Sequence, residues 1–146
     1  VKGEPFVIEY NCRMGDPETE VVIPRLQTDL VALLKAAATG QLSAMKVKTD
    51  PRTACTIVAV SGGYPEHYKK GFTISGLEAA AGTDVSIFHM GTQLRDGVIV
   101  TSGGRVLCVT AFGNSVVEAA KHARSMQEKI QFEGKYFRGD IGFEFN

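Results

Sequence analysis

The sequence has no excess of charge of either sign, because its 16 basic residues are balanced by 16 acidic ones. General nucleic-acid binders usually carry a basic excess, so this balance argues against that class. The chain also lacks an apolar run near the roughly 20 residues that a membrane-spanning helix needs. Its first residues do not have the pattern of a basic, apolar leader. We therefore expect neither nucleic acid nor membrane as a partner, and a cytoplasmic location.

Cysteine is also scarce, and Cys12, Cys55 and Cys108 lie far apart in the sequence. An odd number without CxxC spacing does not suit a disulfide framework or a zinc site, and favours reduced thiols. Apolar residues are abundant: 44% of the 146 residues are hydrophobic and 22% are charged, which is enough to bury a core. The length is typical of one domain or of two small ones.

The first part of the chain predicts one strand and two helices. Residues 6–11 are predicted to form a strand with two distinct faces, one of Phe6, Ile8 and Tyr10 and the other of Val7, Glu9 and Asn11. Asp16 is predicted to cap a helix whose first residue is Pro17. A second helix is predicted from about Thr28, and Gly40 should end it.

The second part of the chain is rich in strand signals. We predict strands at 53–61, 85–90, 92–94, 98–101 and 105–111. Asp96-Gly97 is typical of a tight hairpin turn. An amphipathic helix should run from its cap, Asn114, to about Ile130. The fold class is therefore α+β, with the end of one domain in residues 1–50 and a compact, β-rich domain with one long helix in 51–146.

Glu9 and Asn11 are spaced so that both side chains would project from the same face of a strand. They offer carboxylate and amide oxygens, the donors that Mg²⁺ prefers, and water and phosphate usually complete its shell. This pair is our candidate site for Mg²⁺ or Mn²⁺. From the spacing alone, the solvated face of an edge strand is the simpler interpretation.

The residues that follow this pair strengthen the case for a ligand site. Arg13 offers the fork of donors that suits phosphate or carboxylate, and Gly15 permits close approach of the backbone. The amides that open the helix at Pro17-Glu18 would favour an anion. Asp16 and Glu18 could hold an amine, and the alternative for both is helix capping and dipole compensation.

A second candidate site is Gly103-Gly104-Arg105, a flexible turn whose amides could meet a phosphate. The alternative is an ordinary β-turn with a solvated arginine. His89 and the turn at residues 62–65 are interpreted as structural.

The run from Ile8 to Glu20, IEYNCRMGDPETE, closely resembles the signature of the phosphoribosylamine–glycine ligases, also called glycinamide ribonucleotide synthetases. Its Glu-x-Asn-x-Arg part is shared with other ATP-grasp ligases, and the Arg-x-Gly-Asp-Pro-Glu-Thr continuation is more specific. Further motifs occur in the family's order, namely SGGYP at 61–65, FHMGT at 88–92, GGRVL at 103–107 and FEGKYFR at 132–138. Met14 and Met90 replace other apolar residues that are commoner in the family.

The resemblance implies that residues 1–50 are the C-terminal portion of an ATP-grasp domain, and that 51–146 are the C-terminal domain of the ligase. The family joins glycine to 5-phosphoribosylamine through a glycyl phosphate, in purine synthesis. ATP is consumed, and glycinamide ribonucleotide, ADP and phosphate are formed. The family's N-terminal domain and most of its ATP-grasp domain are missing. We therefore expect the chain to be part of a longer polypeptide, which is its main partner, and to be inactive alone.

The resemblance also implies roles for individual residues. Glu9 and Asn11 correspond to the Mg²⁺ ligands of the family. Catalytic roles would fall to Arg13 and Asp16, and the surrounding 15–18 loop, with Gly15, Pro17 and Glu18, would line the glycine and acyl-phosphate region. Arg105, with Gly103 and Gly104, would hold the 5′-phosphate of phosphoribosylamine. Two alternatives remain, an ATP-grasp carboxylase of purine or biotin metabolism and a non-catalytic binding module.

Overall fold

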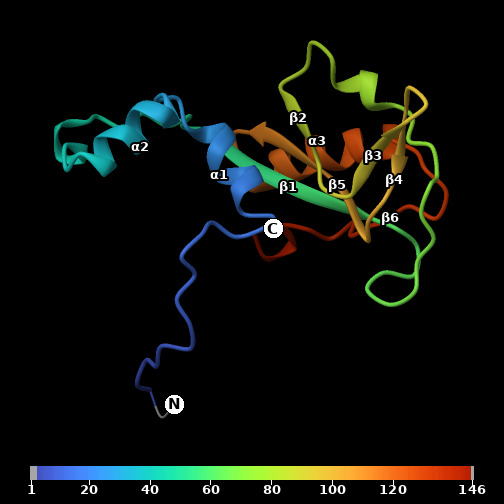
Figure 1. Cartoon of the computed structure of the whole chain (residues 1–146), viewed down its shortest axis with the longest axis horizontal. Coiled ribbons are helices and arrows are strands. Elements are labelled where there is room, and N and C mark those ends of the chain that lie inside the picture. Colours follow the sequence, from blue (N-terminus) through green and yellow to red (C-terminus); the bar gives the residue numbers. More distant parts are fainter. Residues whose placement is uncertain (1–2, 146) are drawn as a thin grey trace.

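A four-stranded antiparallel sheet, in the order β2-β5-β1-β6, forms the centre of the structure (Figure 1). The computed structural model describes residues 3–145. The strands of this sheet are β1 (Thr53–Val60), β2 (Val85–His89), β5 (Arg105–Gly113) and β6 (Tyr136–Phe137). β1 pairs with β5 along its whole length, and β2 pairs with the other edge of β5. β5 is therefore a central strand, and most of its residues are buried.

A separate hairpin joins β3 (Thr92–Arg95) to β4 (Val98–Thr101). Its turn residues Asp96 and Gly97 have φ values of 51° and 79°, as a two-residue hairpin turn requires. The five strands predicted for the second half of the chain are thus confirmed, with ends that differ by one or two residues. The short strand β6 was not predicted, because two residues carry no periodic pattern.

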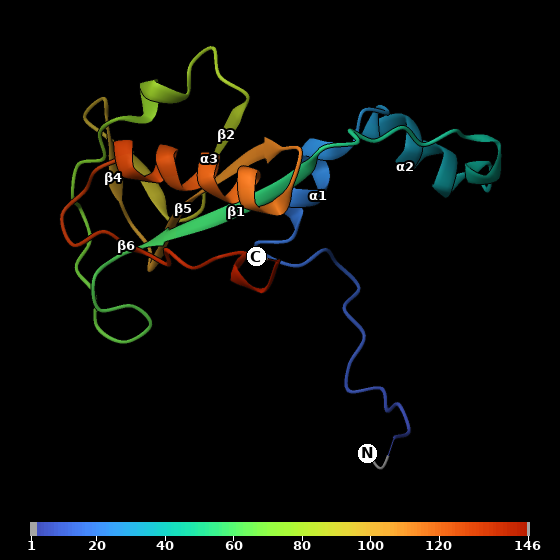
Figure 2. The same cartoon turned by 180° about the vertical axis from the view of Figure 1, so that it is seen from behind.

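The long helix α3 (Val116–Lys129) covers one face of the sheet (Figure 2). Ala119, Ala120 and Ala123 are buried, and their small side chains let α3 pack closely on the sheet. The predicted cap, Asn114, is wrong by one residue. Ser115 caps the helix, since its hydroxyl accepts a 3.2 Å hydrogen bond from the amide of Glu118.

The short helix α1 (Thr19–Arg25) lies against the opposite face. Side chains alternate along a strand, so Thr56 and Thr110 face away from the buried Ile57 on the α3 side. The fully buried hydroxyl of Thr110 donates to the carbonyl of Glu20 at 2.8 Å and lies 3.0 Å from the hydroxyl of Thr56. These bonds fix the start of α1 to the middle of β5.

The predicted helix start at Asp16 and Pro17 is wrong, because α1 begins at Thr19 with Glu18 at the cap position. Asp16 does not cap this helix, since its carboxylate pairs with Arg105 instead. The second predicted helix, α2 (Leu30–Ala38), begins two residues late, where Asp29 accepts a 2.7 Å hydrogen bond from the amide of Ala32. α2 ends before Gly40 as expected, and it projects away from the sheet (Figure 1).

The strand predicted over residues 6–11 is not formed. This segment runs away from the sheet (Figure 1), and its apolar side chains are exposed, with Ile8 at 95% and Tyr10 at 88%. A strand needs a neighbouring strand to satisfy its backbone groups, and no strand of residues 3–145 lies beside this segment. The alternating pattern is therefore insufficient by itself. The division of the chain near residue 50 stays a prediction.

Candidate functional site

A cavity of about 480 Å³ lies where the segment before α1 meets the start of β5. We call it the Arg105 cavity, and its walls are formed by Asp16, Glu20, Tyr64, His89, Met90, Gly91, Gly103, Gly104 and Arg105. Its volume falls within the range of small-molecule sites, about 300–1,000 Å³. The two candidate sites of the sequence, the 15–18 loop and the 103–105 turn, both contribute to it.

Arg105 and Asp16 form the direct link between those two candidate sites. Arg105 Nη2 lies 3.1 Å from Asp16 Oδ2, and Nη1 donates a longer, 3.4 Å bond to the Asp16 carbonyl. Both side chains are partly exposed, at 40% and 47%. An exposed ion pair of this kind contributes little to stability, so a ligand anion can compete for the guanidinium.

The turn that precedes Arg105 is held by other backbone segments. Gly103 donates its amide to the carbonyl of Gly91 at 3.0 Å, and its own carbonyl accepts a 2.9 Å bond from the hydroxyl of Ser61. A Cβ atom at Gly103 would lie only 3.0 Å from the Cα of Gly91, so the two chains meet without room for a side chain. This contact orients Arg105 at the start of β5.

Tyr64 and His89 line the Arg105 cavity, although the sequence suggested only structural roles for them. The ring of Tyr64 lies directly over Gly104, where an added Cβ would collide with it. His89 Nδ1 lies 2.9 Å from the hydroxyl of Thr92. Their positions in the glycine-containing motifs SGGYP and FHMGT were the available signal, because glycines often mark close approaches of the backbone.

Glu20 adds a second carboxylate to the wall of the cavity. Its Oε2 atom is shielded from solvent and has no hydrogen-bond partner. Burial raises the pKa of the nearby Cys108 thiol to about 11, and the negative charges of Glu20 and Asp16 add to the rise. The cavity thus combines one guanidinium with two carboxylates.

The proposed metal pair lies outside this cavity. Asn11 Nδ2 donates to Glu9 Oε1 at 3.1 Å, so the two side chains are adjacent although the predicted strand is not formed. Two exposed oxygen-bearing side chains suit two positions of a Mg²⁺ shell that water and phosphate complete. Within residues 3–145, no group of three or more His, Cys, Asp or Glu residues could hold a metal ion.

The remaining candidate site residues of the 13–18 segment do not line the Arg105 cavity. Arg13 donates to the carbonyl of its neighbour Met14 at 3.0 Å and does not line the cavity. The carboxylate of Glu18 folds over Gly15, where an added Cβ would overlap it. Pro17 lines a separate, more apolar cavity of about 370 Å³ that also includes Tyr64 and Arg105. The structure therefore brings Asp16, but not the rest of its loop, to the Arg105 cavity.

Comparison with known proteins assigns the family. Residues 54–144 match the family described as phosphoribosylglycinamide synthetase, C domain. The chain belongs to this family. It is 50% identical over 141 residues to the phosphoribosylamine–glycine ligase of Pseudomonas syringae pv. tomato, and 49% identical to that of Pseudomonas aeruginosa. Each of these comparisons covers 97% of this chain and 33% of the relative.

A solved structure supports the same assignment. The crystal structure of phosphoribosylamine–glycine ligase from Thermotoga maritima is 34% identical in sequence, with a TM-score of 0.73. The match covers 94% of this chain and 34% of the Thermotoga maritima protein. The α+β fold of antiparallel sheets and helices is therefore that of the family. The chain spans about a third of the length of the relatives it matches.

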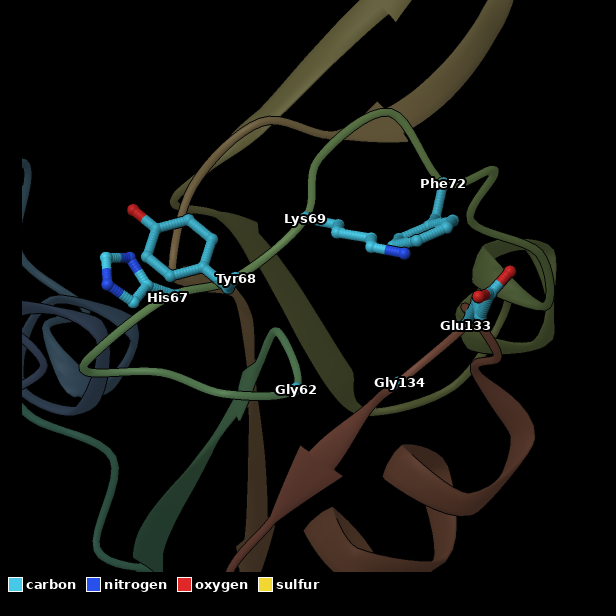
Figure 3. Close-up of a pocket in the computed structure, with 7 residues that line it drawn as sticks. All are labelled: Gly62, His67, Tyr68, Lys69, Phe72, Glu133 and Gly134. Carbon is cyan, nitrogen blue, oxygen red and sulfur yellow. The ribbon is translucent and has the colours of Figure 1, made fainter.

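The Arg105 cavity lies across the edge of the matched synthetase C domain. Tyr64, His89 and Arg105 belong to the matched region, whereas Asp16 and Glu20 come from the segment before it. A further cavity of about 390 Å³ lies entirely within the matched region, between loop 62–72 and residues 133–134. Figure 3 shows Lys69 reaching toward Phe72 there, with Glu133 at another side of the hollow. None of the predicted site residues lines this further cavity.

Proposed function

We propose that this chain serves a phosphoribosylamine–glycine ligase, in which ATP, glycine and 5-phosphoribosylamine give glycinamide ribonucleotide, ADP and phosphate. The observation that carries the proposal is the 50% identity to such a ligase over 97% of the chain. Because the chain spans only a third of those relatives, we expect the rest of the ligase to supply most of the ATP site. This missing N-terminal part is the proposed partner.

The reaction has two steps that need alignment and neutralisation of charge more than a protein nucleophile. The carboxylate of glycine attacks the γ-phosphate of ATP, which releases ADP and forms glycyl phosphate. The amine of phosphoribosylamine then attacks the glycyl carbonyl, loses a proton and displaces phosphate. Both steps place anions close together, so cationic groups that are already in position contribute strongly.

Residues 9–18 are proposed to serve the first step, as the closing part of an ATP-grasp domain within residues 1–50. Glu9 and Asn11 would hold Mg²⁺ or Mn²⁺, which neutralises charge on the phosphates when bound. Arg13 and Asp16 would act beside the acyl phosphate, with the 15–18 loop around the glycine. Support comes from the proximity of the two side chains of the metal pair, because Asn11 Nδ2 lies 3.1 Å from Glu9 Oε1.

Arg105 is proposed to bind the 5′-phosphate of phosphoribosylamine in the second step, beside Gly103 and Gly104 in the domain of residues 51–146. A guanidinium suits phosphate through its paired donors. The ion pair to Asp16 supports this assignment, since the amine must reach the glycyl phosphate that forms beside the 15–18 loop.

No helix in the part of the chain that the structure describes is long and apolar enough to cross a membrane. We propose a cytoplasmic enzyme.

The proposal is tested by assaying the complete ligase that contains this chain beside the chain alone. The complete ligase should release ADP steadily only when glycine and phosphoribosylamine are both present, and the chain alone should release none steadily. ADP release that instead depends on bicarbonate would point to a carboxylase. Steady ligation by the chain alone would show that the rest of the ligase is not needed.

A further inference from the structure

Glu20 is a charged group of the Arg105 cavity to which the proposed function gives no role. It is half-buried in the first turn of α1, and its Oε2 atom has neither solvent nor a hydrogen-bond partner. A shielded carboxylate oxygen without a donor is unfavourable, and such groups usually have a partner. A ligand in the cavity would lie against this side chain, because Glu20 forms part of its wall.

The backbone of Glu20 is held by a hydrogen bond from the sheet. Its carbonyl accepts the 2.8 Å bond from Thr110, which is itself fully buried in the central strand β5. Arg105 begins the same strand, so β5 sets the backbone positions of both residues. The walls of the cavity therefore hold a cation at Arg105 and a carboxylate at Glu20.

This arrangement suits a ligand with an anion at one end and hydrogen-bond donors elsewhere. A carboxylate only accepts hydrogen bonds, and one of its oxygens suffices to receive a hydroxyl group. We infer that Glu20 accepts a hydrogen bond from a ribose hydroxyl of the sugar phosphate whose phosphate contacts Arg105. Glu20 is thereby a specificity-determining residue that distinguishes ribose from deoxyribose. This inference rests on the proposed function.

The contact gives the charged group of Glu20 a role in the choice of sugar. A site built to bond a hydroxyl rejects an analogue without it, because its polar group is then left unpaired. The other role open to Glu20 is compensation of the α1 dipole, which would affect stability and not the choice of sugar. A third role, as the base that takes the proton from the attacking amine, would lower kcat rather than sugar affinity.

The test uses the complete ligase and three inhibitors that cannot react, ribose 5-phosphate and its 2-deoxy and 3-deoxy counterparts. Inhibition constants against phosphoribosylamine are measured for the wild type, Glu20→Gln and Glu20→Ala. The wild type should prefer ribose 5-phosphate over at least one deoxy sugar by about 10-fold, the order expected for a hydrogen bond to a charged group. Glu20→Ala should reduce that preference to about 2-fold or less.

Glu78→Gln is the matched control, since it removes one exposed carboxylate near α3, away from the Arg105 cavity. It should keep the wild-type preference. The inference is overturned if Glu20→Ala still discriminates between the sugars, or if only kcat falls. Equal losses for glycine, ATP and phosphoribosylamine with a lower Tm would also overturn it. If the wild type ligates normally but binds ribose 5-phosphate and both deoxy sugars equally well, the inference alone is refuted. If the wild type has no ligase activity, the proposed function is refuted as well.

Discussion

Arg105 Nη2 lies 3.1 Å from Asp16 Oδ2, although the two residues are 89 positions apart. The sequence placed them in two separate sites, one for the acyl phosphate and one for the substrate's phosphate. Their pairing joins those sites at one wall of a cavity of about 480 Å³. The carboxylate of Asp16 then offsets the charge of Arg105 until an anionic ligand binds.

Arg105→Ala in the complete ligase should weaken the use of phosphoribosylamine by about 10- to 100-fold, because a hydrogen bond to a charged group contributes about 1.5–3 kcal/mol. The KM values for glycine and ATP should change far less. Arg105→Lys should recover only part of the loss, since lysine keeps the charge without the fork. Three KM measurements on each variant check this, and an equal loss for all three substrates would indicate misfolding instead.

Arg13→Ala should behave differently from Arg105→Ala, because we place Arg13 beside the acyl phosphate. Turnover with glycine should fall, while the KM for phosphoribosylamine changes little. The comparison of kcat at saturating glycine for the two variants decides the matter. If Arg13→Ala raises mainly the KM for phosphoribosylamine, the division of labour between the two regions is wrong.

Glu9→Ala and Asn11→Ala should each lower kcat of the complete ligase by about 100-fold or more, the order seen when an electrostatic contact to the transition state is lost. Added Mg²⁺ should restore part of the activity, because weaker binding is offset by concentration. Titration of kcat against Mg²⁺ measures both effects. Near-normal kcat at limiting Mg²⁺ would leave these residues as a solvated segment.

Gly104→Ala should destabilise the chain by about 1–3 kcal/mol, the usual cost of an added group in a packed site, because the new Cβ meets the ring of Tyr64. Urea unfolding of Gly104→Ala, Tyr64→Ala and the double variant measures the coupling. In the Tyr64→Ala background, the added methyl group should cost much less. Equal costs in both backgrounds would mean that the tyrosine ring is not what excludes a side chain at Gly104.

One of the three thiols should react with a thiol reagent in the folded chain near pH 8, and all three should react after unfolding. Cys12 is exposed, whereas Cys55 and Cys108 are buried. Because burial raises the pKa of Cys108 to about 11, its thiolate fraction at this pH is also very small. Rapid reaction of two or three thiols in the folded chain would contradict the packing of β1 and β5.

Sequence alone determined most of the local elements of the second half of the chain, and the family. β-branched runs and the Asp96-Gly97 turn located the strands of the second half, since the alternation of side chains is a local property of each strand. The motif from Ile8 to Glu20 led to the ligase family, because a motif is recognised from the order of residues along the chain and needs no tertiary structure. A pattern of this kind was not sufficient for residues 6–11, where a strand depends on a neighbour for its backbone bonds.

Tertiary structure decided which residues meet. Packing of α1 on the central strand carries Asp16 and Glu20 to Arg105, through bonds between residues about 90 positions apart. The ring of Tyr64 covers Gly104 only because loop 61–72 folds back over the start of β5. The spacing of residues along the chain does not predict such contacts, since folding brings distant segments together through packing and hydrogen bonds. The composition of the cavity, with a guanidinium and two carboxylates among its walls, therefore follows from the fold and not from any motif.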